Sequence, residues 1–422
     1  MDASREREET MDDRSFYQTV LGLPEPWVVE SVELRPGDEE VWVWVGPRPG
    51  APLKCPECSA ESPGYDRSEE RRWRHLDTMQ YRTILVSQVP RVRCATHGVR
   101  QVRIPWAEER SRFTALFETW AIRLLRESTV SGVAELLGLS WDEVAHIQRR
   151  AVARGMARRS AEPIRVLGID ETSFQKRHEY VTVINDLEGD RVLWVGDHRR
   201  EATLREFWES RPLEERRALR AVVMDMWDPY IAATRDGVPH GLSKIVFDRY
   251  HVVAHLTAAV SDVRKAEQRE LQRAGDAARA AQLKGKRFTL VKGKSRRTVE
   301  DEAEIQALRK AGFKVGRAWS LKEAANIIWQ CATAKAALAE FNKWYGWAIR
   351  SRLAPMKRAA RMMKRYLFGI LKYTRHPFTN ARTEGMNSKI QLIKHRARGY
   401  RNRENFRNAI LFHCGGLDMN PC

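Results

Sequence analysis

Three acidic residues have the types and positions that metal-dependent cutting and joining of a phosphodiester chain would require. Asp170 follows the apolar run 166–169, Asp225 follows the apolar run 221–224, and Glu384 starts a strongly basic segment with helical spacing. A carboxylate at the end of a buried strand sits on a rigid element while its oxygens reach a cleft, which suits divalent cations. Two such strands and one helix carboxylate can hold two metal ions about 4 Å apart. The pattern predicts a phosphoryl-transfer site, while a turn former or helix cap is the ordinary alternative for any single one of these residues.

The segments around these acids predict the sheet that positions them. The β-rich runs 180–184 and 191–195 are joined by a short segment with Gly and Asp, which predicts a hairpin. A helix is expected over 202–217, followed by the Asp225 strand, further helix and a strand over 244–247. Three strands, a helix, a strand, more helix and a strand make a mixed sheet covered by helices.

A second group of residues has the spacing of zinc ligands. Cys55 and Cys58 form one CxxC pair, and Cys94 with His97 forms a second knuckle. Each pair can bind one side of a tetrahedral Zn²⁺, so we expect a structural zinc module. His75 is an alternative fourth ligand. A redox-active thiol pair is the other interpretation of the CxxC, but no thioredoxin-like βαβ pattern surrounds it.

The segment after the cysteines predicts a helix-turn-helix. A short apolar helix stops at Gly138, and Ser140 with Glu143 has the sequence of a capping box that begins the next helix. The polar side chains expected outside the core of the second helix are His146, Gln148, Arg149 and Arg150. Such side chains can reach base edges or phosphates, which favours DNA binding over a plain helical hairpin with the same pattern.

The helix predicted at Glu384 is the expected wall of the active site. Three- and four-residue spacing places these polar residues on one helical face: Glu384, Asn387, Ser388 and Gln391. Cations then follow at Lys389, Lys394, His395, Arg396, Arg398, Arg401, Arg403 and Arg407. We expect DNA contacts from Asn387, Lys389, Lys394, Arg396, Arg398 and Arg401. An ordinary basic surface helix is the alternative.

The stretch between Asp225 and Glu384 is long and mostly helical in pattern. Ser320 and Glu323 have capping-box spacing within it, and the basic segment 284–297 predicts either a DNA-tracking loop or a solvated charged turn. The fold class predicted for the whole chain is α+β and multidomain. The expected parts are a charged mobile N-terminus (1–30), a zinc-binding module (31–108), a helical helix-turn-helix domain (109–160), the first part of a catalytic domain (161–264), a helical insertion (265–379), and the second part of the catalytic domain with a basic C-terminal segment (380–422).

The charge composition of the chain is consistent with binding to nucleic acid. The 422 residues contain 74 Lys and Arg against 55 Asp and Glu, a formal net charge of +19. Counterion release makes such a surface attractive to any nucleic acid. The sequence has no apolar run long enough for a membrane span, and its first residues are too charged for a secretory signal. We therefore expect a soluble, cytoplasmic, nucleoid-associated protein with no membrane partner.

Four separate motifs resemble a known family when taken in order. They are GIDETSF (168–174), VVMDMWDPY (222–230), FDRYHV (247–252) and NARTEGMNSKIQLIK (380–394). With the cysteine cluster, the resemblance to insertion-sequence transposases of the ISL-three family covers roughly residues 30–415. It implies a ribonuclease H-like domain of the DDE type with Asp170, Asp225 and Glu384 as the triad. It also implies two Mg²⁺ (or Mn²⁺) ions per active site. The implied partner is double-stranded DNA, which includes both the terminal inverted repeats of the element and the target. A homo-oligomer, expected to be a dimer on paired ends, would bind this DNA.

Other functions remain open from the sequence alone. A regulator or domesticated derivative could use the zinc module and helix-turn-helix without catalysis, and a nuclease could cut without joining. A tyrosine recombinase would use one of Tyr250, Tyr366, Tyr373 and Tyr400, but the arginine and histidine residues of such a site are not evident. Asp228 and Asp248 are further acids that could support or replace a member of the triad.

Overall fold

The chain forms two compact units. The computed structural model describes residues 12–159, 162–175, 179–376 and 381–421, except for the side chains of 381–384. One unit comprises residues 1–159 with 417–422, and the other comprises residues 160–416. Among the described residues, no helix combines the length and the apolar character that crossing a lipid bilayer requires.

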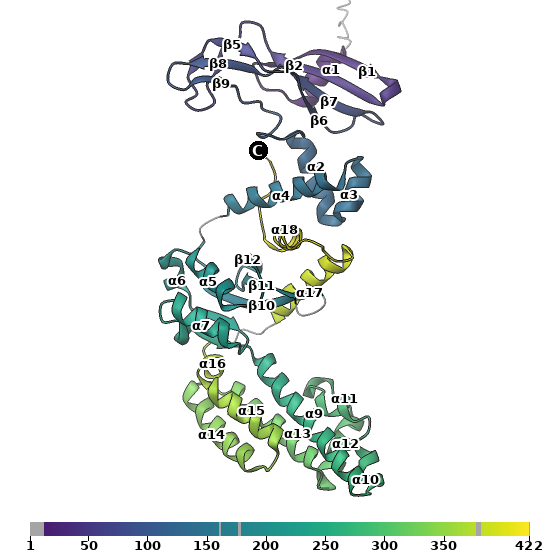
Figure 1. Ribbon diagram of the computed structural model, residues 1–422, viewed down its shortest axis with the longest axis vertical. Coiled ribbons are helices and arrows are strands. Elements are labelled where there is room, and N and C mark those ends of the chain that lie inside the picture. Colours follow the sequence, from purple (N-terminus) through teal and green to yellow (C-terminus); the bar gives the residue numbers. More distant parts are fainter. Residues whose placement is uncertain (1–11, 160–161, 176–178, 377–380, 422) are drawn as a thin grey trace, which may run out of the picture. The chain divides into compact units, whose positions relative to one another are not determined.

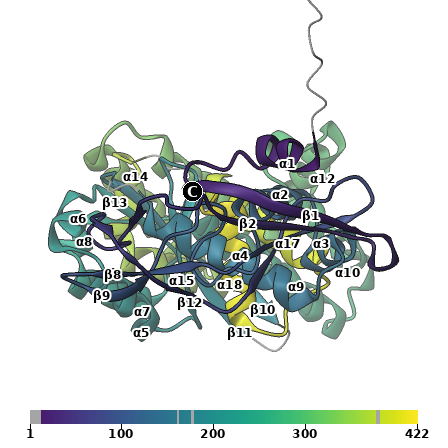
Figure 2. The same cartoon turned by 90° about the horizontal axis from the view of Figure 1, so that it is seen from above.

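The first unit starts with one larger and two smaller sheets. The larger sheet has the order β1-β2-β7-β6, with β2 and β7 parallel and the other neighbours antiparallel. Its elements, with those of the smaller sheets, are α1 (Asp13–Leu21), β1 (Trp27–Arg35), η1 (Pro36–Asp38), β2 (Glu40–Pro47), β3 (Leu53–Lys54), β4 (Glu61–Ser62), β5 (Gly64–Arg67), β6 (Arg71–Arg74), β7 (Arg82–Ser87), β8 (Pro90–Cys94) and β9 (Gly98–Gln101). The long strands β1 and β2 run side by side in Figures 1 and 2. Buried Trp27, Trp73 and Trp106 pack ring edge to ring face with centroids 4.9 and 5.6 Å apart, which anchors the core of this part.

Three helices complete the first unit. They are α2 (Ala115–Glu127), α3 (Val130–Leu137) and α4 (Trp141–Ala157). Gly138 ends α3 at φ 62°, a left-handed conformation that suits glycine. Ser140 then caps α4, and the Glu143 side chain returns to the Ser140 backbone, so the predicted capping box is confirmed. Buried Val144 and Ile147 turn one face of α4 into the core.

The second unit contains the predicted mixed sheet. Its order is β12-β11-β10-β13-β14, antiparallel between β12, β11 and β10 and parallel between β10, β13 and β14. The strands are β10 (Val166–Gln175), β11 (Glu179–Asp186), β12 (Arg191–Asp197), β13 (Ala221–Met224) and β14 (Ile245–Phe247), with α5 (Glu201–Glu209), α6 (Leu213–Ala218), α7 (Asp228–Gly237) and α8 (Gly241–Lys244) between them. The hairpin expected between β11 and β12 is confirmed by their antiparallel pairing.

Two predicted boundaries in this sheet region are wrong. The helix expected over 202–217 is two helices, because Pro212 starts a new helix and cannot continue α5. Lys244 belongs to α8 rather than to the last strand, and its Nζ donates to the carbonyls of Arg216 and Arg217. The order of the elements is nevertheless the predicted one.

A run of helices separates β14 from the last two helices. The run consists of α9 (Arg249–Arg273), α10 (Ala277–Leu283), α11 (Arg287–Val291), η2 (Lys294–Arg296), α12 (Val299–Lys310), α13 (Lys314–Ala325), η3 (Asn326–Gln330), α14 (Ala334–Arg350), α15 (Ala354–Arg365) and α16 (Leu367–Lys372). Figure 1 shows these helices gathered on one side of the sheet, while α17 (Ala381–Arg396) and α18 (Arg403–Cys414) lie against another part of it. One continuous core joins sheet and helices. At that junction Gly369 of α16 lies directly against the ring of buried Phe247.

Two sequence interpretations in the helical run need correction. Ser320 does not cap a helix: it lies within α13, whose buried Ala318, Leu321 and Ala325 keep the helix continuous through that point. The basic segment 284–297 is not a plain loop, since it contains α11 and η2. Its cations Lys286, Lys292 and Arg297 are paired with carboxylates of α12, at 2.5, 2.6 and 2.9 Å respectively.

Candidate active site and metal centres

Three aspartates lie at one level across neighbouring parallel strands. Gly168 of β10 pairs with Val223 of β13, which pairs with Val246 of β14. The aspartates Asp170, Asp225 and Asp248 each follow one member of this row by two residues. Side chains two positions apart on a strand point to the same side, so the register brings the three carboxylates together.

The position of Asp170 differs from the prediction that it ends a strand. Residues beyond it, as far as Gln175, continue to pair with β11, so Asp170 lies in the middle of β10. On the opposite edge, β10 pairs with β13 only as far as Gly168. Asp170 therefore lies in the part of β10 that extends beyond its parallel neighbour β13.

His251, which was not predicted to be a site residue, joins this acidic cluster. Its Nε2 lies 2.9 Å from Asp225 Oδ1 and 3.5 Å from Asp248 Oδ2. Burial opposes the imidazolium, but the hydrogen bond and charge of Asp225, followed by the charge of Asp248, raise the pKa of His251 to about 9. The signal in the sequence was its place in the first turn of α9, three residues after Asp248.

Burial and mutual repulsion act on the carboxyl groups themselves. Burial first, and then the charge of Asp225, raises the pKa of Asp170. Burial raises the pKa of Asp248 to about 6 and that of Glu171 to about 7. Arg199 partly offsets the charge of Glu171, with Nε 2.7 Å from Glu171 Oε1. The cluster carries more negative than positive groups, which is the electrostatic condition for binding a cation.

Helix α17 runs along β10 and supports the strand that carries Asp170. Asn387 Nδ2 donates to Asp170 Oδ2 at 2.6 Å, and Gln391 Nε2 donates to Thr172 Oγ1 at 2.5 Å. One turn further on, Lys394 Nζ donates to the carbonyl of Ser173 at 2.7 Å. The predicted third acid, Glu384, belongs to this helix, but its side chain lies outside the described residues.

The other predicted contacts of the C-terminal segment differ in exposure and in the partners that the structure gives them. Asn387 and Lys394 are engaged with β10, as described above. Lys389 is exposed and lies 3.5 Å from Asp190. Arg396, Arg398 and Arg401 are exposed at the end of α17 and just after it.

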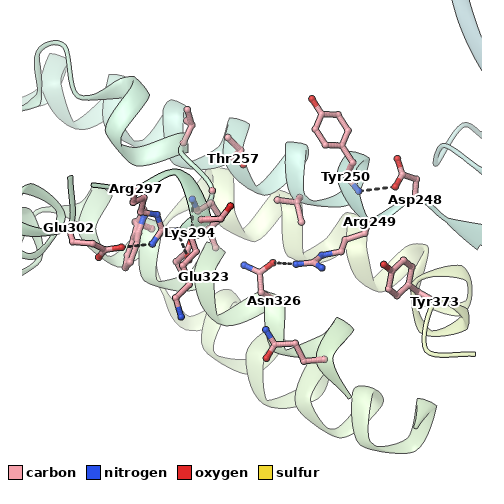
Figure 3. A pocket seen from close by; sticks show the side chains of 17 residues that line it. Asp248, Arg249, Tyr250, Thr257, Lys294, Arg297, Glu302, Glu323, Asn326 and Tyr373 are labelled. Atoms are coloured by element: carbon pink, nitrogen blue, oxygen red, sulfur yellow. Dashed lines mark hydrogen bonds and ion pairs between the residues drawn. The ribbon is translucent and has the colours of Figure 1, made fainter. Parts of the chain in front are cut away.

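A cavity of about 840 Å³ lies next to Asp248, between α9, α13 and the segment 293–297. Figure 3 shows Arg249 reaching into it, with its Nη2 donating to Asn326 Oδ1 at 3.1 Å. Tyr250 and Tyr373 also line it. The Tyr366 hydroxyl, in contrast, donates to Asp228 Oδ1 at 2.8 Å. The same Asp228 pairs with Arg365 at 2.7 Å, so this further acid serves an ion pair outside the cluster.

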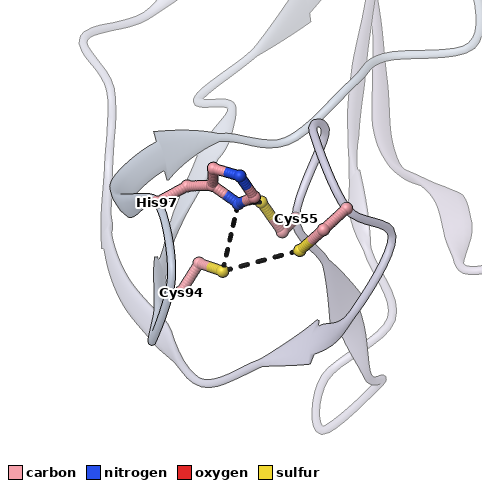
Figure 4. Close-up of side chains that lie close together, drawn as sticks. Cys55, Cys94 and His97 are labelled. Atoms are coloured by element: carbon pink, nitrogen blue, oxygen red, sulfur yellow. Dashed lines mark hydrogen bonds between the residues drawn. The ribbon is translucent and has the colours of Figure 1, made fainter.

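The zinc ligands predicted from spacing converge in the first unit. Cys58 Sγ and Cys94 Sγ are 3.6 Å apart, and His97 Nδ1 is 3.7 Å from both Cys55 Sγ and Cys94 Sγ. Bond lengths to zinc of about 2.0–2.3 Å at tetrahedral angles give ligand separations of about 3.5–3.8 Å, so this Cys₃His set fits Zn²⁺. Figure 4 shows Cys94 and His97 facing Cys55 from the other knuckle. Backbone N–H groups of His97 and Thr96 lower the pKa of Cys94 to about 6, which favours the thiolate that zinc requires.

The alternative zinc ligand His75 takes no part in this centre. Its Nδ1 lies 2.9 Å from Thr114 Oγ1, and the side chain is buried beneath the start of α2. Burial, and then the cation of Arg74, lowers the pKa of His75 to about 4. The residue is a neutral part of the core.

The recognition helix predicted from the sequence differs in two side chains. Gln148 was expected outside the core, but it is buried, because α4 turns two neighbouring positions, 147 and 148, into the unit. Arg150 is paired with Glu108 at 2.9 Å and with buried Glu118 at 3.1 Å. Arg149 is exposed. The helix thus offers fewer side chains to a partner than its composition indicated.

The fold, the acidic cluster, the zinc centre and the helix-turn-helix define a DNA-processing enzyme, and comparisons with known proteins identify its family. A transposase family model for ISL3 (ISL-three) elements matches residues 167–410, more than half of the chain. A model of the helix-turn-helix domain of transposase family ISL3 matches residues 102–152, and a zinc-finger model of the transposases of IS204, IS1001, IS1096 and IS1165 matches residues 51–97.

Two relatives agree with these matches along almost the whole chain. The transposase for insertion sequence element IS1001 of Bordetella parapertussis is 30% identical over 400 residues, which cover 94% of this chain and 97% of the relative. The transposase for IS1557 of Mycobacterium tuberculosis H37Rv is 28% identical over 412 residues, 92% of each chain. The chain belongs to the ISL3 family of insertion-sequence transposases. The predicted DNA transposase function, with a structural zinc module and a DNA-binding helix-turn-helix, is therefore confirmed.

Proposed function

We propose that the protein binds the terminal inverted repeats of its insertion sequence, cleaves them, and transfers the 3′-hydroxyl ends to target DNA through a site made by Asp170, Asp225 and Glu384. The observation that carries this proposal is the hydrogen bond from Asn387 to Asp170. Glu384 stands one helical turn before Asn387 on the same face of α17, so the helix directs that face toward the strand of Asp170. In this proposal the second unit is a ribonuclease H-like catalytic domain of residues 161–264 and 380–422, interrupted by the helical insertion 265–379.

The residues present fit a divalent-cation site. Asp170 and Asp225 supply oxygens from adjacent parallel strands, and buried carboxylate oxygens without hydrogen-bond partners, such as Glu171 Oε2, lie close by. Two Mg²⁺ or Mn²⁺ ions bound there would lower the pKa of the attacking water or 3′-hydroxyl and offset charge on the leaving oxygen. Asn387 holds the Asp170 carboxylate in place, and the pair of Glu171 with Arg199 fixes the far side of β10.

The cations near the end of α17 are the proposed phosphate contacts of the catalytic unit. Exposed Arg396, Arg398 and Arg401 are consistent with this role, whereas Lys394 also fastens α17 to β10. The helix-turn-helix is proposed to read the element's ends through Arg149, whose side chain is exposed on α4, whereas Gln148 is buried. Paired ends would bring two copies of the chain together as a dimer.

The proposal is tested with DNA that carries the element's own ends, which inverted repeats in the flanking DNA identify. With Mg²⁺ or Mn²⁺, the purified protein should nick end-bearing duplex and then produce molecules in which those 3′-ends are joined to a target plasmid. Cleavage without joined products would identify a nuclease. Binding without cleavage in either metal would identify a regulator and refute the proposed activity.

The division of DNA contacts is tested by two sets of substitutions. Arg149→Ala should weaken binding to the element's ends more than binding to random DNA, because a groove contact depends on sequence. Arg396→Ala with Arg398→Ala should weaken both equally and flatten the salt dependence, since phosphate contacts release counterions without reading bases. Titrations of both DNAs at several salt concentrations measure this, and equal losses on both DNAs for both variants would contradict it.

A further inference from the structure

We propose that Asp225, Asp248 and His251 form a binding site for a divalent transition-metal ion, with the imidazole of His251 as a nitrogen ligand. The inference rests on the proposed function only in sharing Asp225 with the proposed catalytic acids. It adds two ligands, Asp248 and His251, and with them a preference for one class of ion.

The first support is convergence. One ligand atom from each of the three residues lies within 4.8 Å of the others. Ligands of a divalent ion with bonds of about 2.1 Å stand about 3.0 Å apart when cis and about 4.2 Å apart when trans, so small side-chain movements bring all three to one ion. The convergence follows from the fold, because Asp225 and Asp248 occupy matching positions after the paired strands β13 and β14. His251 is on the first turn of the helix that Asp248 begins.

The second support is an unsatisfied oxygen. The Asp248 side chain is 5% exposed. Its Oδ1 accepts from the backbone N–H of Tyr250 at 3.0 Å and so caps α9. Its Oδ2 is buried and has no hydrogen-bond partner among the described residues, while His251 Nε2 stands 3.5 Å away. A buried carboxylate oxygen without a hydrogen-bond partner is costly unless a ligand satisfies it, and this one lies next to the imidazole of His251.

The surrounding charges favour a cation. Asp170, Asp225 and Asp248 bring three carboxylates to one row, and the imidazole of His251 lies beside two of them. Arg199 is engaged with Glu171, and Arg249 points into the neighbouring cavity toward Asn326 (Figure 3). Asp248 lines that cavity as well.

The ligand set indicates which kind of ion would bind. Mg²⁺ prefers oxygen ligands and water in a nearly ideal octahedron, whereas imidazole suits transition ions. Two carboxylates and one imidazole therefore favour Mn²⁺ over Mg²⁺ at this position. The competing explanation is that His251 is only an imidazolium paired with two aspartates.

The test measures Mn²⁺ binding to the full-length, zinc-loaded protein without DNA. Continuous-wave electron paramagnetic resonance counts bound Mn²⁺, and pulsed measurements detect coupling of Mn²⁺ to a directly coordinated imidazole nitrogen. His251→Gln removes the proposed ligand, and His255→Gln is its matched control, an exposed histidine one turn further along α9. Asp248→Asn removes charge while the asparagine can still cap α9, and exposed Asp262→Asn is its control.

The wild-type protein should show the nitrogen coupling, and His251→Gln should abolish it. His251→Gln and Asp248→Asn should each weaken Mn²⁺ affinity by at least about tenfold, and the two controls should not. His251→Glu replaces nitrogen with oxygen, so it should recover affinity for Mn²⁺ without the nitrogen coupling. This recovery separates loss of a ligand from loss of the fold. No nitrogen coupling in the wild-type protein, or unchanged affinity in Asp248→Asn, would overturn the proposal in favour of the ion pair.

Failure here is distinguishable from failure of the proposed function. If the nitrogen coupling is absent while Asp170→Asn abolishes DNA cleavage, only the His251 site is refuted. If the coupling is present while Asp170→Asn cleaves DNA normally, the metal site stands and the triad assignment fails.

Discussion

The substitution Asp170→Asn is the sharpest test of the catalytic assignment, because the structure indicates how the protein would accommodate it. Asp170 accepts two hydrogen bonds, from the backbone N–H of Glu171 at 2.8 Å and from Asn387 Nδ2 at 2.6 Å. An asparagine can keep the first with its amide oxygen, but its amide nitrogen would then face Asn387 Nδ2. Rotation of the Asn387 amide removes that clash, since its Oδ1 is buried and has no hydrogen-bond partner among the described residues.

The expected stability change is therefore small. Exchanging two charge-assisted hydrogen bonds for neutral ones costs roughly 1 kcal/mol each. Removal of a buried charge beside Asp225 offsets this cost, so the net change in the free energy of unfolding should stay within about 2 kcal/mol in either direction. Affinity for DNA without metal should be unchanged or higher, because one negative charge near the DNA is gone.

Catalysis should respond very differently. Loss of one carboxylate ligand from a two-metal site removes several kcal/mol of transition-state stabilisation. We expect cleavage of end-bearing DNA to fall at least about a thousandfold, equivalent to roughly 4 kcal/mol. Asp228→Asn is the matched control, because that acid pairs with Arg365 outside the cluster. Cleavage by Asp170→Asn within tenfold of the wild-type rate, in a protein that folds and binds DNA, would refute the assignment of Asp170 as a ligand.

Three further predictions concern the scaffold. Cys94→Ser should release zinc and unfold the zinc-binding part of the first unit. The control Cys331→Ser changes a cysteine outside the Cys₃His set and should keep the metal; zinc analysis with circular dichroism measures both. Gly369→Ala should lower the free energy of unfolding by roughly 1–3 kcal/mol, because its new Cβ would lie 2.5 Å from Phe247 Cε2; denaturant unfolding measures this, and an unchanged midpoint would contradict it. The pKa of His75 is lowered to about 4 in the folded protein, so the unfolded chain binds the proton first as the pH drops. The free energy of unfolding should therefore fall between about pH 6.5 and about pH 4, by up to roughly 3 kcal/mol. His75→Gln should remove that part of the pH dependence in unfolding experiments at fixed zinc, and an unaltered pH profile would show that His75 is not its source.

Local patterns were sufficient for much of the fold and for the zinc site. The capping box at Ser140 and the left-handed Gly138 depend on residues three or four apart, so the sequence contains the whole interaction. The Cys₃His set was likewise predictable, because two short knuckles fix four ligands once they meet. The order of strands and helices around Asp225 followed from alternation and turn residues.

The features that the sequence did not predict depend on contacts between residues that are distant in sequence. Arg150 looks like an exposed cation on its own helix, yet it is paired because Glu108 and Glu118 approach from other segments. His251 is an unremarkable helix residue until β13 places Asp225 2.9 Å from its Nε2. Asp170 was placed at a strand end because the apolar run stops there, whereas pairing with β11 extends the strand. No local pattern contains these contacts.

The cluster depends on strand register, which is set by residues that do no chemistry. A shift of one residue in β13 or β14 would turn Asp225 or Asp248 to the opposite face of the sheet, because side chains alternate along a strand. Gly168 occupies the row that fixes this register, and a Cβ at that position would lie 2.8 Å from Leu187 Cδ2. Buried Val223 and Val246 complete the row. The three acids can converge only while this apolar row stays aligned, so the packing beneath the site determines which oxygens an ion would meet.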